Sequence, residues 1–205
     1  MSYERHNIKS VSKDLQKFVI NTPVLRFDII DSLCNCNVFF KCENFQHTGS
    51  FKYRAAINAI KKMPVEFKQT GVITHSSGNF AHALARAAYE LKIPCHIVMP
   101  NNTPNFKKSS VLSYTKNVIE CESNLKAREF TTSEILKNKN LYFIHPSNNM
   151  DVILGNSSCA LEFVNDYPNL DFIFSPIGGG GLIAGTSIAI NNFSENCQVI
   201  GAEPS

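Results

Sequence analysis

The sequence predicts an α/β protein built on parallel sheets. Short apolar runs alternate with helical segments along most of the chain, which is the order that strand–helix–strand units produce. The 205 residues are 43% hydrophobic and 18% charged, which is enough apolar material for one large domain or two small ones. No internal repeat or low-complexity tract interrupts the alternation, so we expect ordinary globular domains.

The first predicted elements surround residue 50. Residues 37–43 (NVFFKCE) predict a strand, because valine and phenylalanine suit a pleated surface. Residues 50–62 predict a helix, since Phe51, Ala55 and Ala59 roughly follow the helical period.

The rest of the chain continues the alternation of strands and helices. Each further strand is expected at a short apolar run, and the helices lie between these runs. We expect strands at 71–74, 95–99, 117–121, 141–144, 171–175 and 198–202. We expect helices at 79–91, 105–114, 125–136, 152–165 and 182–191.

Prolines near residues 64 and 146 suggest two domain boundaries. Residues 65–148 hold several strand–helix units and are expected to form a small α/β domain. Residues 1–64 and 149–205 would then come together as a large domain. Clefts between such domains, at the carboxyl ends of strands, are where α/β folds bind ligands.

Charge and cysteine usage exclude several classes of protein. The net charge is +3 and the basic residues are dispersed, so no nucleic-acid partner is expected. No run approaches the roughly 18 apolar residues of a membrane span, and the polar start leads into no signal peptide, so the expected location is cytoplasmic. The seven cysteines form no CxxC pair, which favours buried free thiols in a reducing compartment.

Lys52 is the first candidate for chemistry. It lies in Gly-Ser-Phe-Lys-Tyr-Arg, after an expected strand and at the start of an expected helix. The positive end of a helix dipole disfavours a protonated amine, and a lysine that attacks an aldehyde must be neutral. On this segment alone, an ordinary solvated lysine is the simpler interpretation.

Four consecutive glycines form the second candidate site: Gly178, Gly179, Gly180 and Gly181. They follow an expected strand and precede an expected helix, so backbone N–H groups can converge on a phosphate with no Cβ in the way. A structural turn and a dinucleotide-binding loop are the alternatives. A dinucleotide fingerprint usually opens the first strand–helix–strand unit, whereas these glycines come late; this motif alone leaves that alternative open.

A turn of two serines, a glycine and an asparagine is the third candidate. Ser76, Ser77, Gly78 and Asn79 lie between a strand and a helix, where they can cap the helix and form a nest for a carboxylate. Capping alone does not explain both hydroxyls. An amine, this turn and an anion cradle, in this order, describe a site for pyridoxal phosphate.

Together these segments resemble the fold-type II pyridoxal phosphate enzymes, most closely serine racemases and serine/threonine dehydratases. The most specific stretch is 41–54 (KCENFQHTGSFKYR), and 22–25, 74–79 and 202–205 follow in the family's order. The resemblance implies two parallel-sheet domains of the tryptophan synthase beta-like kind.

The resemblance also implies roles on the cofactor side. Lys52 would hold the cofactor and act as the base on one face of the substrate. Phe51 would pack on the cofactor ring, Asn79 would hydrogen-bond the ring hydroxyl, and the four glycines would hold the phosphate.

On the substrate side, the resemblance implies that Ser77 is the acid or base on the opposite face. Ser76 and Arg128 would meet the substrate, with Arg128 on its carboxylate. Glu203 matches a carboxylate of a divalent-cation site, which implies Mg²⁺.

The sequence departs from the family pattern at several positions. Phe80-Ala81-His82 replaces the usual His-Gly-Gln or His-Ala-Gln, Ala55 replaces a glycine, and Gly155-Asn156-Ser157-Ser158 replaces Gly-Gln-Gly-Thr. Ser147 stands where asparagine is common. Family members continue well beyond Ser205, so we expect an incomplete large domain, poor turnover by this chain alone, and association such as a homodimer.

These observations predict a pyridoxal phosphate-dependent serine/threonine dehydratase, a serine racemase, or both, acting on a small hydroxy amino acid. Two alternatives stay open. One is a truncated homologue without catalytic activity, and the other is a cysteine-synthase-like β-replacement enzyme, which fits the Ser-Ser-Gly-Asn turn less well.

Overall fold

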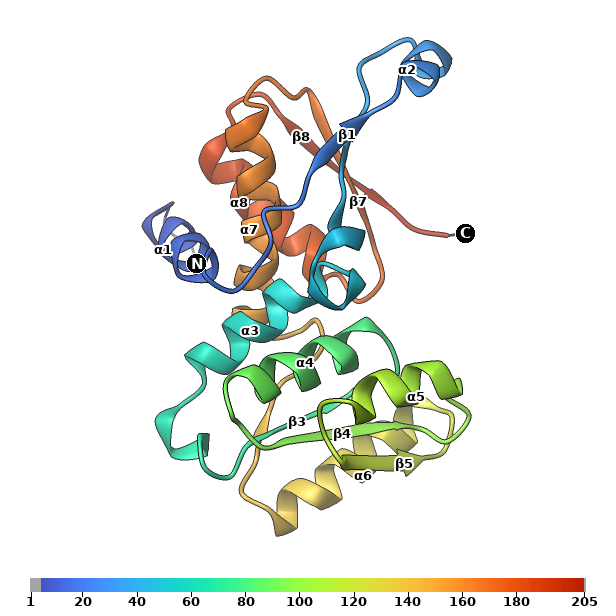
Figure 1. Ribbon diagram of the computed structural model, residues 1–205. Coiled ribbons are helices and arrows are strands. Elements are labelled where there is room, and N and C mark those ends of the chain that lie inside the picture. The colour runs from blue at the N-terminus through green and yellow to red at the C-terminus, as the bar shows by residue number, and fades with distance from the viewer. Residues whose placement is uncertain (1–4, 205) are drawn as a thin grey trace.

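The computed structural model describes residues 5–204 and distributes its strands over three sheets (Figure 1). The largest is a four-stranded parallel sheet with the order β5-β4-β3-β6. Its strands are β3 (Val72–His75), β4 (Cys95–Pro100), β5 (Asn117–Cys121) and β6 (Tyr142–Phe143). The parallel order confirms the predicted α/β architecture.

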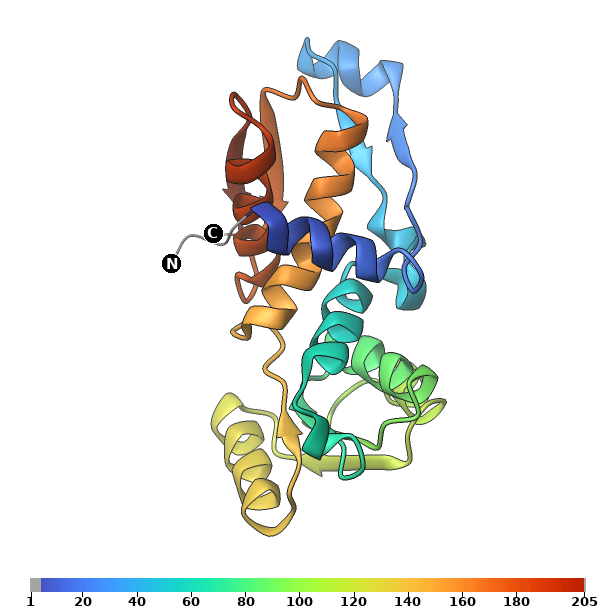
Figure 2. The same cartoon turned by 90° about the vertical axis from the view of Figure 1, so that its left-hand side faces the viewer.

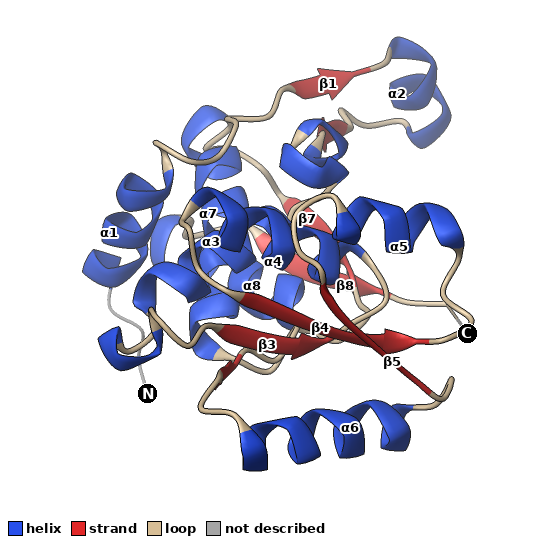
Figure 3. Ribbon diagram, turned by 60° about the horizontal axis from the view of Figure 1, so that its bottom comes forward, coloured by secondary structure: helices blue, strands red, loops and turns tan. Residues whose placement is uncertain are grey.

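Helices cover both faces of this sheet. Helices α4 (Asn79–Glu90) and α5 (Asn105–Leu112) lie on one face and α6 (Leu125–Asn138) lies on the other (Figure 3). Both central strands, β3 and β4, are buried along their whole length, because a parallel sheet between two helical layers has no solvent face. The carboxyl ends of β3, β4 and β5 therefore open at one edge, close to the starts of α4, α5 and α6.

A second parallel pair lies in the other half of the chain. It consists of β7 (Phe172–Pro176) and β8 (Gln198–Ala202), which are joined through α8 (Gly181–Phe193). Helix α7 (Met150–Asp166) packs along α8, and α1 (Arg5–Leu15) lies across them (Figure 2).

The third sheet differs from the prediction. Strands β1 (Val24–Arg26) and β2 (Phe39–Lys41) pair antiparallel around α2 (Asp28–Cys34), whereas the sequence predicted only parallel sheets. After α2 the chain turns back, so β2 runs beside β1 in the opposite direction. We call residues 24–41 the β1–β2 arm. Cys34 and Cys36 lie on this arm and are exposed, so the expectation of buried thiols is wrong for these two.

Helix α3 (Lys52–Lys62) joins the parts of the molecule. It packs against α7 and α4, and its buried apolar side chains continue into the core under α4 and β4. Gly155 of α7 permits this approach, since an added Cβ there would lie 2.5 Å from the Arg54 carbonyl oxygen. The division into residues 65–148 and the two flanking segments stays a prediction.

Three short 3-10 turns complete the described elements, at Glu43–Phe45, His47–Gly49 and Val65–Phe67. Within residues 5–204, no helix combines the length and the apolar character required to cross a bilayer.

Candidate active site

The Lys52 amine is held in a half-buried position at the start of α3. Its Nζ donates a hydrogen bond to the Pro146 carbonyl oxygen at 2.9 Å. The centroids of the Phe51 and Phe80 rings lie 5.1 Å and 5.7 Å from Nζ. Burial lowers the pKa of Lys52, because removal from water disfavours the ammonium form. The environment thus favours a reactive, neutral amine.

The glycine run connects β7 to α8 and packs on the segment that follows Pro146. A Cβ at Gly179 would lie 2.5 Å from Ser147 Oγ, so only glycine fits this approach. Gly180 has a φ of 80°, a left-handed conformation that glycine adopts without strain. Lys52 and the glycine loop therefore meet at adjacent residues, Pro146 and Ser147.

The residues present fit a ligand that carries both an aldehyde and a phosphate. The first N–H groups of α8 have no acceptor within the helix, and the helix dipole makes them a site for an anion. Among the described residues, three buried polar side chains near these segments have no hydrogen-bond partner: Ser50, Asn156 and Ser175. Unpaired N–H donors, a loop without Cβ atoms and an amine whose pKa is lowered suit such a ligand.

The Ser76–Asn79 turn closes another side of the site. It follows β3, and the Ser76 N–H donates to the Val98 carbonyl at 3.0 Å. The Gly78 N–H donates to Ser76 Oγ at 3.4 Å. Asn79 begins α4, and its neighbour Phe80 is the ring near Lys52. The turn therefore lies near the amine; that the two form one site stays a prediction.

A cavity of about 350 Å³ opens at the carboxyl edge of the four-stranded sheet. Ser77, Thr103, Lys107 and Arg128 are among its lining residues, and none of the lining residues is acidic. Arg128 Nε and Thr103 Oγ1 are buried and have no partner among the described residues. The cavity is therefore cationic and offers unused donors to an anion. The sequence predicted Ser77 and Arg128 for this purpose, but it did not single out Lys107 or Thr103.

Two histidines lie close together, at the end of β3 and just before Pro146. The His75 and His145 ring centroids are 5.5 Å apart. His145 Nδ1 accepts hydrogen bonds from the backbone N–H groups of Ser147 at 3.1 Å and Asn148 at 2.8 Å. Burial lowers the pKa of both rings; Arg128 lowers that of His75 further, and Lys52 lowers that of His145. Both rings are therefore mainly neutral near pH 7. Neither histidine was predicted from the sequence to have a role.

Glu203 lies at the same edge of β7 and β8 as the glycine loop, since the Ile177 N–H donates to the Ala202 carbonyl at 2.8 Å. Its side chain is exposed. Within residues 5–204, no group of three or more histidine, cysteine, aspartate or glutamate side chains could hold a metal ion. The described residues thus place Glu203 in no such group, and we assign no step to a metal.

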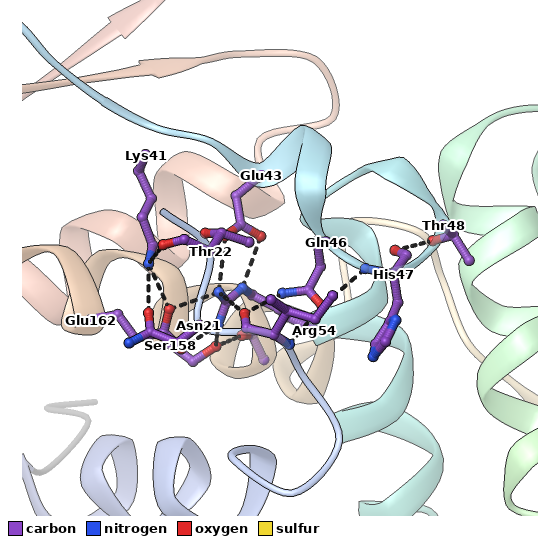
Figure 4. Close-up of polar contacts among 12 residues, drawn as sticks. Asn21, Thr22, Lys41, Glu43, Gln46, His47, Thr48, Arg54, Ser158 and Glu162 are labelled. Carbon is purple, nitrogen blue, oxygen red and sulfur yellow. Dashed lines mark hydrogen bonds and ion pairs between the residues drawn. The ribbon is translucent and has the colours of Figure 1, made fainter. Parts of the chain in front are cut away.

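A buried ionic cluster fixes the helix that carries Lys52 (Figure 4). Arg54 is 0% exposed and bonds Glu43 through Nε at 2.8 Å and Glu162 through Nη1 at 2.7 Å. Lys41 Nζ lies 2.8 Å from Glu162. Burial opposes the charge of Arg54, but the hydrogen bonds to Glu43 and Glu162 outweigh it and raise its pKa. The cluster ties α3 to β2 and α7, two residues from the amine.

Comparison with known proteins agrees with this geometry. The family model described as "Pyridoxal-phosphate dependent enzyme" matches residues 15–205. The serine racemase of Dictyostelium discoideum is 39% identical over 198 residues, which are 97% of this chain and 61% of that protein. Its crystal structure superposes with a TM-score of 0.92, covering 97% of this chain and 65% of that chain.

Two further relatives are named for other reactions. The beta-hydroxyaspartate dehydratase of Paracoccus denitrificans is 40% identical over 190 residues, covering 93% of this chain and 60% of that protein. The threonine deaminase isoform 2 of Solanum lycopersicum is 27% identical, with a TM-score of 0.90 and coverage of 100% of this chain and 58% of that one. The chain spans about 60% of the length of the curated relatives that it matches. These matches confirm the resemblance, the fold and the cofactor class expected from the sequence, and the chain belongs to the family of pyridoxal-phosphate dependent enzymes.

Proposed function

We propose that this chain binds pyridoxal phosphate through Lys52 and Gly178–Gly181 and acts on a small hydroxy amino acid, by dehydration, by racemisation at Cα, or by both. The observation that carries the proposal is the position of the half-buried Lys52 amine. It lies near the Ser76–Asn79 turn and donates a hydrogen bond to Pro146, and the next residue, Ser147, contacts the glycine loop. The names of the relatives, serine racemase and threonine deaminase, support this reaction class.

Lys52 has two tasks in this proposal. Its Nζ would hold the cofactor through the aldehyde carbon, with loss of water, and once displaced by the substrate's amine the freed Nζ would act as the base on the substrate's Cα proton. When bound, pyridoxal phosphate supplies an electron sink that makes this proton removable. The Pro146 carbonyl orients Nζ, and Phe51 and Phe80 exclude water from it. The lowered pKa serves both tasks, because each begins from the neutral amine.

Ser77 is assigned to the opposite face of the substrate. Its side chain lines the cationic cavity, and a hydroxyl there can return a proton to Cα, which inverts its configuration. Dehydration needs the loss of the Cα proton and of the β-hydroxyl as water. The product then takes up water and releases ammonia and a 2-oxo acid. Asn79 would bind the ring hydroxyl, and Ser76 and Arg128 would bind the substrate carboxylate.

The cavity favours a second substrate class. Lys107 and Arg128 supply two positive charges and no lining residue is acidic, whereas the α-carboxylate of serine or threonine needs only one. A hydroxy amino acid with a second carboxylate would use both cations. The name of one relative, beta-hydroxyaspartate dehydratase, supports this candidate.

Absorbance and product assays test the proposal. The purified chain should turn yellow with pyridoxal phosphate, and borohydride reduction followed by peptide mapping should label Lys52. Serine, threonine and β-hydroxyaspartate are then supplied in turn, with assays for 2-oxo acids and D-serine. A colourless protein, or label on another lysine, would contradict the assignment and favour the alternative of a non-catalytic homologue.

Ser77→Ala separates the two reactions. In a version of the chain extended to the length of its relatives, the variant should stay yellow, because the phosphate and the aldehyde are held elsewhere, but D-serine formation should fall about 100-fold or more through loss of one proton donor. Unchanged D-serine formation would refute the role of Ser77. The cation role of Glu203, a homodimer and a cytoplasmic location stay predictions.

A further inference from the structure

Asn156 carries a buried amide whose hydrogen-bonding capacity is unused. The residue is 0% exposed, and neither Nδ2 nor Oδ1 has a partner among the described residues. An amide left unpaired in a protein interior is unfavourable, because it has lost its hydrogen bonds to water without gaining others. Buried polar groups are nearly always paired, so this amide indicates a missing partner.

The position of Asn156 shows where that partner belongs. Its helix, α7, lies between α3 and α8. A Cβ at Gly185 of α8 would lie 2.6 Å from the Ile153 carbonyl oxygen, so α7 and α8 are in backbone contact. A Cβ at Gly181, the first residue of α8, would lie 3.4 Å from Asn156 Nδ2. The amide nitrogen is thus next to the end of the glycine loop.

Several hydrogen-bond donors converge at this point, which also lies near the Ser147 carbonyl oxygen. The first N–H groups of α8 have no acceptor within the helix, and the helix dipole adds partial positive charge. Asn156 Nδ2 adds two further N–H groups from outside the loop. Converging N–H groups of this kind have their hydrogen bonds satisfied when an oxyanion accepts from them. An apolar side chain of similar size would have filled the same space without the cost of an unpaired amide.

We infer that Asn156 is a further phosphate-binding residue, whose side-chain amide donates to the same phosphate monoester as the glycine loop. The inference rests on the proposed function, because it takes the ligand to be pyridoxal phosphate. It adds a side-chain donor on α7 to a cradle that otherwise consists of backbone N–H groups. It also gives a function to the position where the family pattern has glutamine and this chain has asparagine.

A comparison of two ligands isolates the phosphate. Pyridoxal has the aldehyde that reacts with Lys52 but has no phosphate. Dissociation constants for pyridoxal phosphate and for pyridoxal are measured by visible absorbance on the wild-type chain, Asn156→Leu and Asn156→Asp. Asn156→Leu should weaken pyridoxal phosphate binding about ten-fold, the usual effect of losing a hydrogen bond to a charged group. Asn156→Asp should weaken it more, because it places a carboxylate beside the phosphate. Binding of pyridoxal should stay within about two-fold of wild type, since the amide has no contact to lose.

Asn58→Leu is the matched control. Asn58 is also a buried asparagine with an unpartnered Oδ1, but its Nδ2 already donates to the Asp151 carbonyl at 2.7 Å. This variant should lower the thermal unfolding midpoint without changing the ratio of the two dissociation constants. Asn156→Ser, which is smaller, replaces Asn156→Leu if the latter does not fold.

The outcomes distinguish a failure of the proposed function from a failure of the role assigned to Asn156. Wild-type chain that binds neither aldehyde would overturn the proposed function. Wild-type chain that binds both, with Asn156 variants that keep the wild-type ratio or weaken both ligands equally, would overturn the role of Asn156 and leave the proposed function standing.

Discussion

At the scale of single residues, the site depends on a lysine that loses its proton more readily than usual. Lys52 is half-buried, its Nζ donates to a carbonyl, and its pKa is lowered from 10.5 by burial. Its position near two aromatic rings removes water that would otherwise stabilise the charge. The proposed reaction therefore depends on the lowered pKa of Lys52, which the surrounding residues cause by burying the amine.

The lowered pKa predicts a pH dependence for cofactor attachment. The rate at which the chain becomes yellow should rise with pH, with a midpoint below the pKa of an ordinary lysine, because only the neutral amine attacks the aldehyde. Between the folded pKa and 10.5 the unfolded state binds more protons, so the free energy of unfolding should also rise with pH there. Stopped-flow absorbance with Lys52→Ala as a blank measures the first effect. A midpoint at or above 10.5 would contradict it.

Arg54 gives a second prediction at this scale. Arg54→Met leaves Glu43 and Glu162 in place, with side chains only 12% and 14% exposed, so two poorly solvated carboxylates lose their main partner. The free energy of unfolding should fall by about 3–5 kcal/mol, as measured by urea denaturation. Lys137→Met is the control: it breaks an exposed pair with Glu134 and should cost at most about 1 kcal/mol. Equal losses would show that the cluster does not stabilise α3.

At the scale of elements, the contact between α7 and α8 sets the position of the glycine loop. Gly185 is the close point, with an added Cβ only 2.6 Å from the Ile153 carbonyl oxygen and 2.8 Å from the Ser157 nitrogen. Both obstacles are backbone atoms, which cannot rotate away. The start of α8 is thus held in place by a packing contact one helical turn along.

Gly185→Ala should therefore damage both stability and cofactor binding. The overpacked contact should lower the free energy of unfolding by about 1–3 kcal/mol, and the shift of α8 should weaken pyridoxal phosphate binding. Thermal unfolding and absorbance titration measure the two effects. Asn191→Ala, at an exposed position of the same helix, should change neither. A Gly185→Ala chain with wild-type affinity would show that the loop is positioned independently of α8.

Elements were largely predictable because local pattern determines them. The strands predicted at 117–121 and 198–202 have those bounds in the structure. Helix α1 was missed, although Ile8, Val11 and Leu15 are buried at helical spacing. The strand predicted at 37–43 contains β2, but β1 and its antiparallel pairing with β2 were missed, because β1 has only three residues and carries no clear alternation. Its pairing depends on contacts that are distant in sequence.

The cofactor class was predictable from the sequence, but the geometry of the candidate site was not. The order of lysine, serine turn and glycines indicated the cofactor, and the family match removes the dinucleotide alternative that the glycines alone left open. The contact from Lys52 to Pro146 joins residues 94 positions apart, and no local rule predicts such a pairing. The same holds for Lys107, which reaches the cavity only because α5 and α6 begin at the same sheet edge.

At the scale of the whole molecule, histidines set the response to acid. Burial lowers the pKa of five histidines, which lie on several different elements: His47, His75, His82, His96 and His145. Their unfolded value is 6.5, so the unfolded chain takes up protons first as the pH falls. The stability that depends on neutral rings is present above pH 6.5 and is lost below it.

We therefore expect the free energy of unfolding to fall from pH 7 to pH 5, before most carboxylates titrate. Urea denaturation at intervals of pH measures this slope. His75→Phe should make this slope shallower, because the variant lacks one imidazole whose pKa is lowered by burial in the folded state. Constant or rising stability toward pH 5 would contradict the prediction.

The glycine loop has a consequence for how the protein is handled at the bench. Backbone N–H groups at a helix start recognise a tetrahedral oxyanion and nothing else about the molecule that carries it. Sulfate or inorganic phosphate in a purification buffer should therefore occupy the loop and compete with the cofactor. The yellow absorbance of a preparation would then depend on the oxyanions in its earlier buffers as well as on the cofactor supplied. The protein should therefore be exchanged into an oxyanion-free buffer before any titration.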